Sequence, residues 1–363
     1  MKKWKIGIMA GLCVCLCGCS LTEENIDGRA EKNTVTIEKQ DPTKQPEQQK
    51  EQEEQKGEER TYGKFETNLR EYNDYKPKDI LDHAGTFHAT DQNAADKRKS
   101  WEDKEENYMT FPEKGAVSYL SKNYLDSYSW LFNVERGEFR ENFSDICTEK
   151  NEEEEKNAVQ EIEKILRKLQ ITPRNMESFY LDKKALNKLS QLFMTDEEYK
   201  EYIASGEKEF QRKYTEKDQA VLLVSKIDIG GEPLYYREYD ADGRGYFGSY
   251  IRALVKDGKV IWLDISGAVK KEKETEKCKI ISSESAEKKI QDYYKNVQSK
   301  GGINCKNEGI SYVLTLNGDK YQAVPVYSFT VRYIMVSGEG EYREEAEEVE
   351  RVIIDAVSGE WIR

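Results

Sequence analysis

The spacing of apolar residues changes near residue 219, and this change limits the fold more than any other feature of the sequence. Over 152–170 the apolar side chains recur with helical spacing and form one stripe. Residues 220–229 are instead a β-branched and aliphatic run that ends in the turn Gly230-Gly231. Helices followed by antiparallel strands predict an α+β fold rather than the alternating βα units of many ligand-binding folds.

Capping and turn residues set the boundaries of the predicted elements. Thr195 and Glu198 form a capping-box pattern that opens a helix after a helix at about 181–193. Asp257-Gly258 is typical of a tight hairpin turn, and Ser282 is a suitable N-cap for a helix over 283–297. The predicted strands are 220–229, 233–239, 250–255, 260–265, 311–316, 321–335 and 349–355.

The two strand regions resemble copies of one unit. Each closes with a strand that ends in an aspartate, Asp264 or Asp355, and a Ser-Gly turn, at a spacing of about 91 residues. The predicted fold is therefore a helical middle region followed by two α/β-meander repeats, each an antiparallel sheet with a helix. The predicted segments are 1–18, a tether at 19–60, an aromatic-rich region at 61–150, and repeats at 151–275 and 276–363.

The aromatic-rich region and the tether differ sharply in composition. Aromatic and leucine side chains gather over 119–132, and we expect most of them to build core, although such clusters also bind sugars or peptides. Residues 40–56 have almost no large apolar side chains, so they cannot offset the chain entropy lost on folding. A flexible tether of 40 residues has a reach of about 35 Å. A charged helix is the alternative for this segment.

The first residues combine Lys2, Lys3 and Lys5 with an apolar run over 6–16 and the sequence Leu16-Cys17-Gly18-Cys19. The run is shorter than the roughly 20 residues that span a bilayer. The pattern resembles the signal peptide of bacterial lipoproteins, and the alternatives are an ordinary secretory signal and a short membrane anchor. This resemblance implies removal of residues 1–18, acylation of Cys19 with palmitate-type chains, and attachment to the extracytoplasmic face of the cell membrane.

Charge limits the partners that we expect. The full chain has a formal net charge of -13, and residues 1–18 hold three lysines and no acid, so the remainder carries -16. Such a chain repels nucleic acid and anionic headgroups, so no nucleic-acid partner is predicted and the membrane contact is through the lipid anchor.

Three cysteines lie beyond the signal segment: Cys147, Cys278 and Cys305. Cys278 and Cys305 flank the helix predicted at 283–297 and are the candidate disulfide, with three free thiols as the alternative. Their spacing does not match a zinc site, and no metal or cofactor is predicted.

The second repeat resembles the PepSY family in three places. These are the serine-capped helix start at 281–286, the hairpin segment Tyr321 to Val326, and the closing strand Ile354-Asp355-Ala356-Val357-Ser358-Gly359-Glu360, in which Ser358 replaces the family's threonine. Tandem modules behind a membrane anchor are also similar to YycH/YycI-type extracytoplasmic proteins. The resemblance implies binding and restraint of a partner, such as a protease or a sensor, and it carries no catalytic residues. From its position before a Ser-Gly turn, Asp355 is expected to bond its own backbone.

Motifs for covalent chemistry are missing from the sequence. A metal set of Asp82, His83, His88 and Asp91 lacks the helical histidine spacing of zinc hydrolases, and the segment 240–245 lacks most ligands of a calcium loop. No nucleophile elbow or phosphate-binding loop is present. We therefore expect a non-enzymatic protein that binds a protein or peptide at the cell envelope. The alternatives are a solute-binding lipoprotein of a transporter and a carboxylate-based cell-wall hydrolase.

Overall fold

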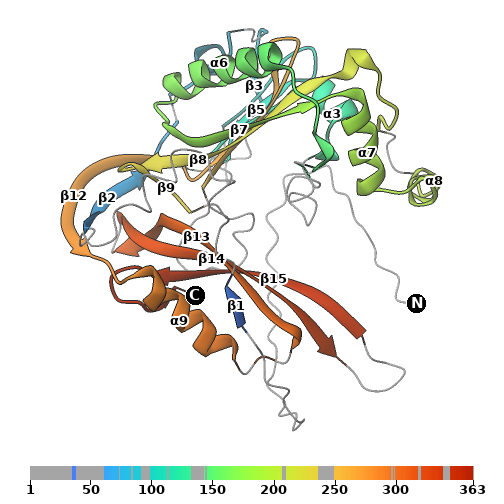
Figure 1. Cartoon of the computed structure of the whole chain (residues 1–363). Helices are drawn as coiled ribbons and strands as arrows, with labels where there is room; N and C mark the ends of the chain where they lie inside the picture. Colours follow the sequence, from blue (N-terminus) through green and yellow to red (C-terminus); the bar gives the residue numbers. More distant parts are fainter. Residues whose placement is uncertain are drawn as a thin grey trace.

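The computed structural model describes two β-sheets that are stacked at an angle and joined along one side (Figure 1). No helix within the described residues is long and apolar enough to cross a membrane. The described residues are 35–37, 61–72, 74–82, 85–90, 99–112, 114–131, 143, 145–206, 210–235, 249–295, 297, 299–317, 320–337 and 344–362.

The first sheet, called the large sheet, has nine antiparallel strands in the order β3-β4-β5-β6-β11-β10-β8-β7, with β9 paired to β8. The central strands β8, β10 and β11 are buried on both faces, because a hydrophobic core lies on each side of the sheet. The strands are β3 (His88–Ala89), β4 (Lys99–Glu102), β5 (Tyr108–Phe111), β6 (Val117–Leu120), β7 (Pro173–Leu181), β8 (Ala220–Ile229), β9 (Glu232–Pro233), β10 (Tyr250–Lys256) and β11 (Lys259–Ser266).

Helices pack on opposite faces of the large sheet. The apolar stripe of α6, with Ile162 and Leu166, joins a core that contains Leu223 and Leu263. The helix α7 buries Leu186 in a second core on the other face, together with α3. The helices around this sheet are α2 (Pro77–Ile80), α3 (Lys122–Ser127), α6 (Glu152–Lys168), α7 (Lys183–Phe193), α8 (Asp196–Ala204) and the 3₁₀ turn Glu216–Asp218.

The second sheet, called the small sheet, has seven strands along the path β1-β13-β14-β15-β16, with β2 paired to both β12 and β14. The helix α9 (Ser283–Tyr294) covers one of its faces through Ala286, Ile290 and Tyr294. The strand β1 comes from the predicted tether and pairs in parallel with β13. The strands are β1 (Val35–Ile37), β2 (Thr61–Leu69), β12 (Val269–Lys279), β13 (Ser299–Asn317), β14 (Lys320–Ser337), β15 (Glu344–Asp355) and β16 (Trp361–Ile362).

The two sheets share one core. The strand β12, which bends at the left of Figure 1, follows β11 of the large sheet and pairs with β2 of the small sheet. Phe65 of β2 and Tyr312 of β13 pack edge to face at 5.5 Å and belong to the same core as α6. The Tyr312 hydroxyl donates to the Gly63 carbonyl at 2.8 Å, so one buried ring fixes two strands of the small sheet.

Short-range predictions are confirmed where one residue sets the local backbone. The Thr195–Glu198 capping box forms, and the Ser282 hydroxyl accepts the Ser285 amide at the start of α9. Asp257 and Gly258 have φ of 50° and 69°, the left-handed pair that a type I′ hairpin requires.

The predicted α+β class with a helical middle region is wrong. The protein is mostly β-structure, and its middle region supplies the edge of the large sheet. Residues 61–150 contribute five strands, β2 to β6, whose partners include β12 and β11 about 150–200 residues away. No strand was predicted there, because β3 to β6 are each only two to four residues long and too short for a clear periodicity in the sequence. The boundary placed between residues 275 and 276 lies inside β12.

Candidate functional site

The lipidation candidate Cys19 lies outside the described residues. Cys278 in β12 and Cys305 in β13 are both buried and free, so the structure has the free-thiol alternative and not the candidate disulfide. Burial raises the pKa of Cys278 and raises the pKa of Cys305 to about 12. Cys147 is also free and buried, which makes all three thiols core residues in this structure.

The candidate metal ligands do not converge. Asp82 forms an ion pair with Lys168 of α6 at 2.5 Å, and His88 is exposed in β3. His83, Asp91 and the segment 240–245 lie outside the described residues. Among the residues that are described, no group of three potential ligands gathers.

The described aromatic side chains of the patch, over 119–131, are buried in the core, as expected. Tyr124 stacks on Trp262 with ring centroids 5.0 Å apart, and both rings are buried against α7. Trp130 donates its indole N–H to the Tyr214 hydroxyl at 2.6 Å. These contacts place the described rings against other buried side chains of the protein.

Asp355 has the backbone role predicted for it. One carboxylate oxygen accepts the amides of Val357 at 2.7 Å and Ser358 at 2.8 Å, which closes the turn between β15 and β16. Asp355, which lies in the segment that resembles the PepSY family, therefore stabilises the turn through its own backbone.

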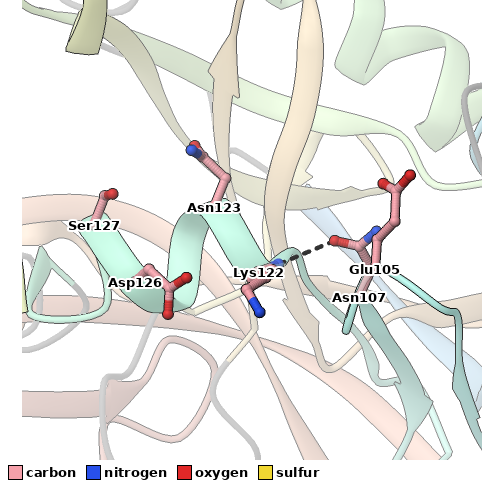
Figure 2. A pocket seen from close by; sticks show the side chains of 6 residues that line it. All are labelled: Glu105, Asn107, Lys122, Asn123, Asp126 and Ser127. Atoms are coloured by element: carbon pink, nitrogen blue, oxygen red, sulfur yellow. Dashed lines mark hydrogen bonds between the residues drawn. The ribbon is translucent and has the colours of Figure 1, made fainter. Parts of the chain in front are cut away.

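An open depression of about 390 Å³ lies between α3 and the turn that joins β4 to β5 (Figure 2). The Lys122 amide donates to Asn107 at 3.0 Å, and Asn107 donates to Asp103 at 2.8 Å. These bonds connect the β4–β5 turn to the start of α3. They join an amide side chain to a backbone amide and a carboxylate, which is not a nucleophile–base pair. The lining residues are Glu105, Asn107, Lys122, Asn123, Asp126 and Ser127.

A second pocket lies where the large sheet meets the small sheet. The hydroxyl of Ser311 is buried there without a hydrogen-bond partner in the described part of the chain, and Thr330 donates to Glu308 at 3.1 Å. Its volume of about 30 Å³ suits one or two water molecules and is too small for a metabolite.

The outer edge of β15 is the most distinctive surface. The strand pairs with β14 over all twelve of its residues, whereas β16 pairs only with Ile353 and Ile354. Within the described part of the chain, residues 344–352 therefore have one unpaired edge. The sequence of this stretch contains five glutamates, and the Val349 side chain is 46% exposed.

An aromatic and carboxylate group, called the Glu350 cluster, lies beside this edge. Glu350 of β15 accepts the Tyr294 hydroxyl at 2.5 Å and also the Tyr333 hydroxyl. Both tyrosines have a raised pKa, chiefly because of burial and then because of the hydrogen bond to this carboxylate. The rings of Tyr293 and Trp361 lie 4.6 Å apart at the side of the group.

The sequence did not identify this site. The predicted strand began at residue 349, because the glutamate-rich stretch before it resembles a solvated loop. The alternation that places Glu348 and Glu350 on one face was present in the sequence. The helix that supplies Tyr293 and Tyr294 was predicted, but its position over β15 depends on long-range packing.

Comparisons with known proteins show a similarity in fold and do not indicate a function. No family model matches the chain, and no curated protein matches it. The structure is similar to that of an uncharacterized protein from Eubacterium rectale, with a TM-score of 0.56 and 14% sequence identity. The match covers 84% of this chain and 86% of that one, so the fold extends over most of both proteins.

Proposed function

We propose that this chain is a lipid-anchored, extracytoplasmic protein that binds an extended segment of a partner protein at the outer edge of β15. In this role the protein restrains its partner at the cell envelope and performs no reaction of its own. The unpaired β15 edge is the observation that carries the proposal. The lipoprotein-type start of the sequence supports the location.

An unpaired strand edge provides affinity through main-chain hydrogen bonds, and the side chains around it provide specificity. The β15 edge is long, since it offers 344–352 beyond the short pairing with β16. Glu348 and Glu350 discourage pairing between two copies of this edge, because like charges would come together. The same charges favour a partner strand that carries basic residues.

Neighbouring proline variants test the edge. Successive N–H groups of a strand point to opposite edges, so one of Glu347→Pro and Glu348→Pro removes an outward N–H while the other breaks a bond to β14. We expect the outward variant to keep the melting temperature of the wild type. It should also lose crosslinked partner from envelope preparations and the partner-induced protection of β15 amides from hydrogen exchange.

Equal partner recovery with the folded edge variant and the wild type would contradict the proposal. The anchor is tested separately with Cys19→Ser. This variant should no longer incorporate labelled palmitate and should leave the membrane fraction, whereas Cys147→Ser should stay there. Retention of Cys19→Ser on the membrane would refute the anchor.

A further inference from the structure

We infer that the Glu350 cluster binds a lysine or arginine side chain of the segment that pairs with β15. This inference rests on the proposed function and names the chemistry that the edge recognises. It depends on three features: the face that an added strand would present, the arrangement of the rings, and the charge of Glu350.

The face follows from the register of β15. Residues opposite each other in an antiparallel pair project to the same side of the sheet. Glu350 projects to the side covered by α9, since it accepts the Tyr294 hydroxyl. A partner residue opposite Glu350 therefore projects to that side as well. Trp361 of β16 pairs with Ile354 of β15. A segment paired with residues 344–352 would therefore lie along the same edge of β15, end to end with β16.

The rings form a partly open aromatic group. Tyr293 is 48% exposed, and its ring centroid lies 4.6 Å from that of Trp361 and 5.0 Å from that of Tyr294. Tyr294 is in turn 5.9 Å from Tyr333. A cation is attracted to the face of such rings when it lies within about 6 Å of the centroid. An exposed tyrosine beside a tryptophan on a β-edge thus offers a surface for a cationic side chain.

The carboxylate supplies the charge. Two tyrosine hydroxyls donate to Glu350, one to each oxygen, and these bonds orient the group while leaving further acceptor positions on both oxygens. Glu350 is an exposed residue, and its hydrogen bond to Tyr333 is exposed, so an incoming ammonium or guanidinium group can approach the carboxylate from that side. The aliphatic stem of lysine or arginine would contact the rings while its charged end pairs with Glu350.

The experiment uses the purified full chain and a host octapeptide of alternating threonine and valine with one variable central residue. The central residue is lysine, arginine, trimethyl-lysine, norleucine or glutamate. Binding is measured by fluorescence anisotropy, and hydrogen exchange of β15 reports the edge contact. We expect the lysine and arginine peptides to bind at least tenfold more tightly than the norleucine peptide. Trimethyl-lysine should retain most of this preference through the rings.

Variants of the protein separate the cluster from the edge. Tyr293→Leu and Glu350→Gln should each weaken binding of the lysine peptide at least fivefold and leave the norleucine peptide unchanged. Leu192→Ala, at an exposed apolar position on α7, is the matched control and should change neither. Melting temperatures establish that each variant is folded.

The outcomes distinguish the two proposals. If lysine and norleucine peptides protect β15 equally, strand pairing stands and the cation site is wrong. If no peptide protects β15, the pairing edge itself is contradicted. A preference for lysine that survives both Tyr293→Leu and Glu350→Gln would place cation recognition elsewhere and overturn the inference.

Discussion

At the scale of single residues, Asp355 joins a turn to a strand through two backbone amides. We predict that Asp355→Ala lowers the free energy of unfolding by about 1–2 kcal/mol, because two amides lose their acceptor. Asp355→Asn keeps one acceptor oxygen and should cost less. Urea denaturation measures both. If the alanine variant kept full stability, a role for Asp355 outside the turn would follow.

The three thiols give a second prediction at this scale. A chain that begins after Cys19 should titrate three free thiols after unfolding without reductant, since Cys147, Cys278 and Cys305 are all free. In the folded protein they should react slowly, because all three are buried. A single titrated thiol, together with a disulfide-linked peptide that joins Cys278 to Cys305, would support the candidate disulfide and contradict the free thiols of the structure.

The raised pKa of Cys305 sets a pH dependence. Burial raises this pKa to about 12 from an ordinary value of 9.0, so the folded protein keeps a proton that the unfolded chain releases. The resulting stability is complete below pH 9 and falls as the pH rises towards 12. The difference in unfolding free energy between wild type and Cys305→Ala should shrink by roughly 1–2 kcal/mol between pH 8 and 10.5. A constant difference would contradict the burial of this thiol.

At the scale of elements, Gly115 packs against the short connection between β11 and β12. Its amide donates to Arg70 at 2.7 Å, its carbonyl accepts from Ala268 at 2.9 Å, and its φ is 76°. A Cβ atom would lie 2.9 Å from the Ala268 carbonyl oxygen, whereas Gly258, with φ of 69°, has no atom within 4 Å of that position.

We predict that Gly115→Ala destabilises the protein by about 1 kcal/mol or more beyond Gly258→Ala. Both variants carry the same left-handed backbone strain, so the difference measures the close approach of two chain segments at the junction. Thermal or urea unfolding gives both values. Equal losses would show that the junction has room for a side chain.

Elements and turns followed from the sequence where the interactions are local. The stripe of α6, the Thr195 cap and the Asp257-Gly258 turn depend on residues within a few positions of one another. Sheet membership did not follow, because β2 pairs with β12 and β14 at separations of about 200 residues or more. The β15 edge was not predictable for the same reason. A strand lies at an edge when no other strand pairs with one of its sides, and this depends on the arrangement of the whole sheet.

At the scale of the whole molecule, the anchor and the edge define one arrangement. The parallel pairing of β1 with β13 places residues 35–37 on the opposite margin of the small sheet from β15. The proposed arrangement therefore has the anchored end of the chain entering the small sheet at one margin and the acidic edge at the other.

Photo-crosslinking in intact cells tests the central claim most directly. The full lipoprotein would carry p-benzoylphenylalanine in place of Val349 on the β15 edge, or in place of Leu316, which is 59% exposed at the end of β13. The proposed function predicts a discrete protein adduct from position 349, and mass spectrometry of that adduct should identify a segment with a lysine or arginine. Position 316 should give no such adduct. Adducts of equal yield from both positions, or an adduct from position 316 alone, would contradict a partner bound at the β15 edge.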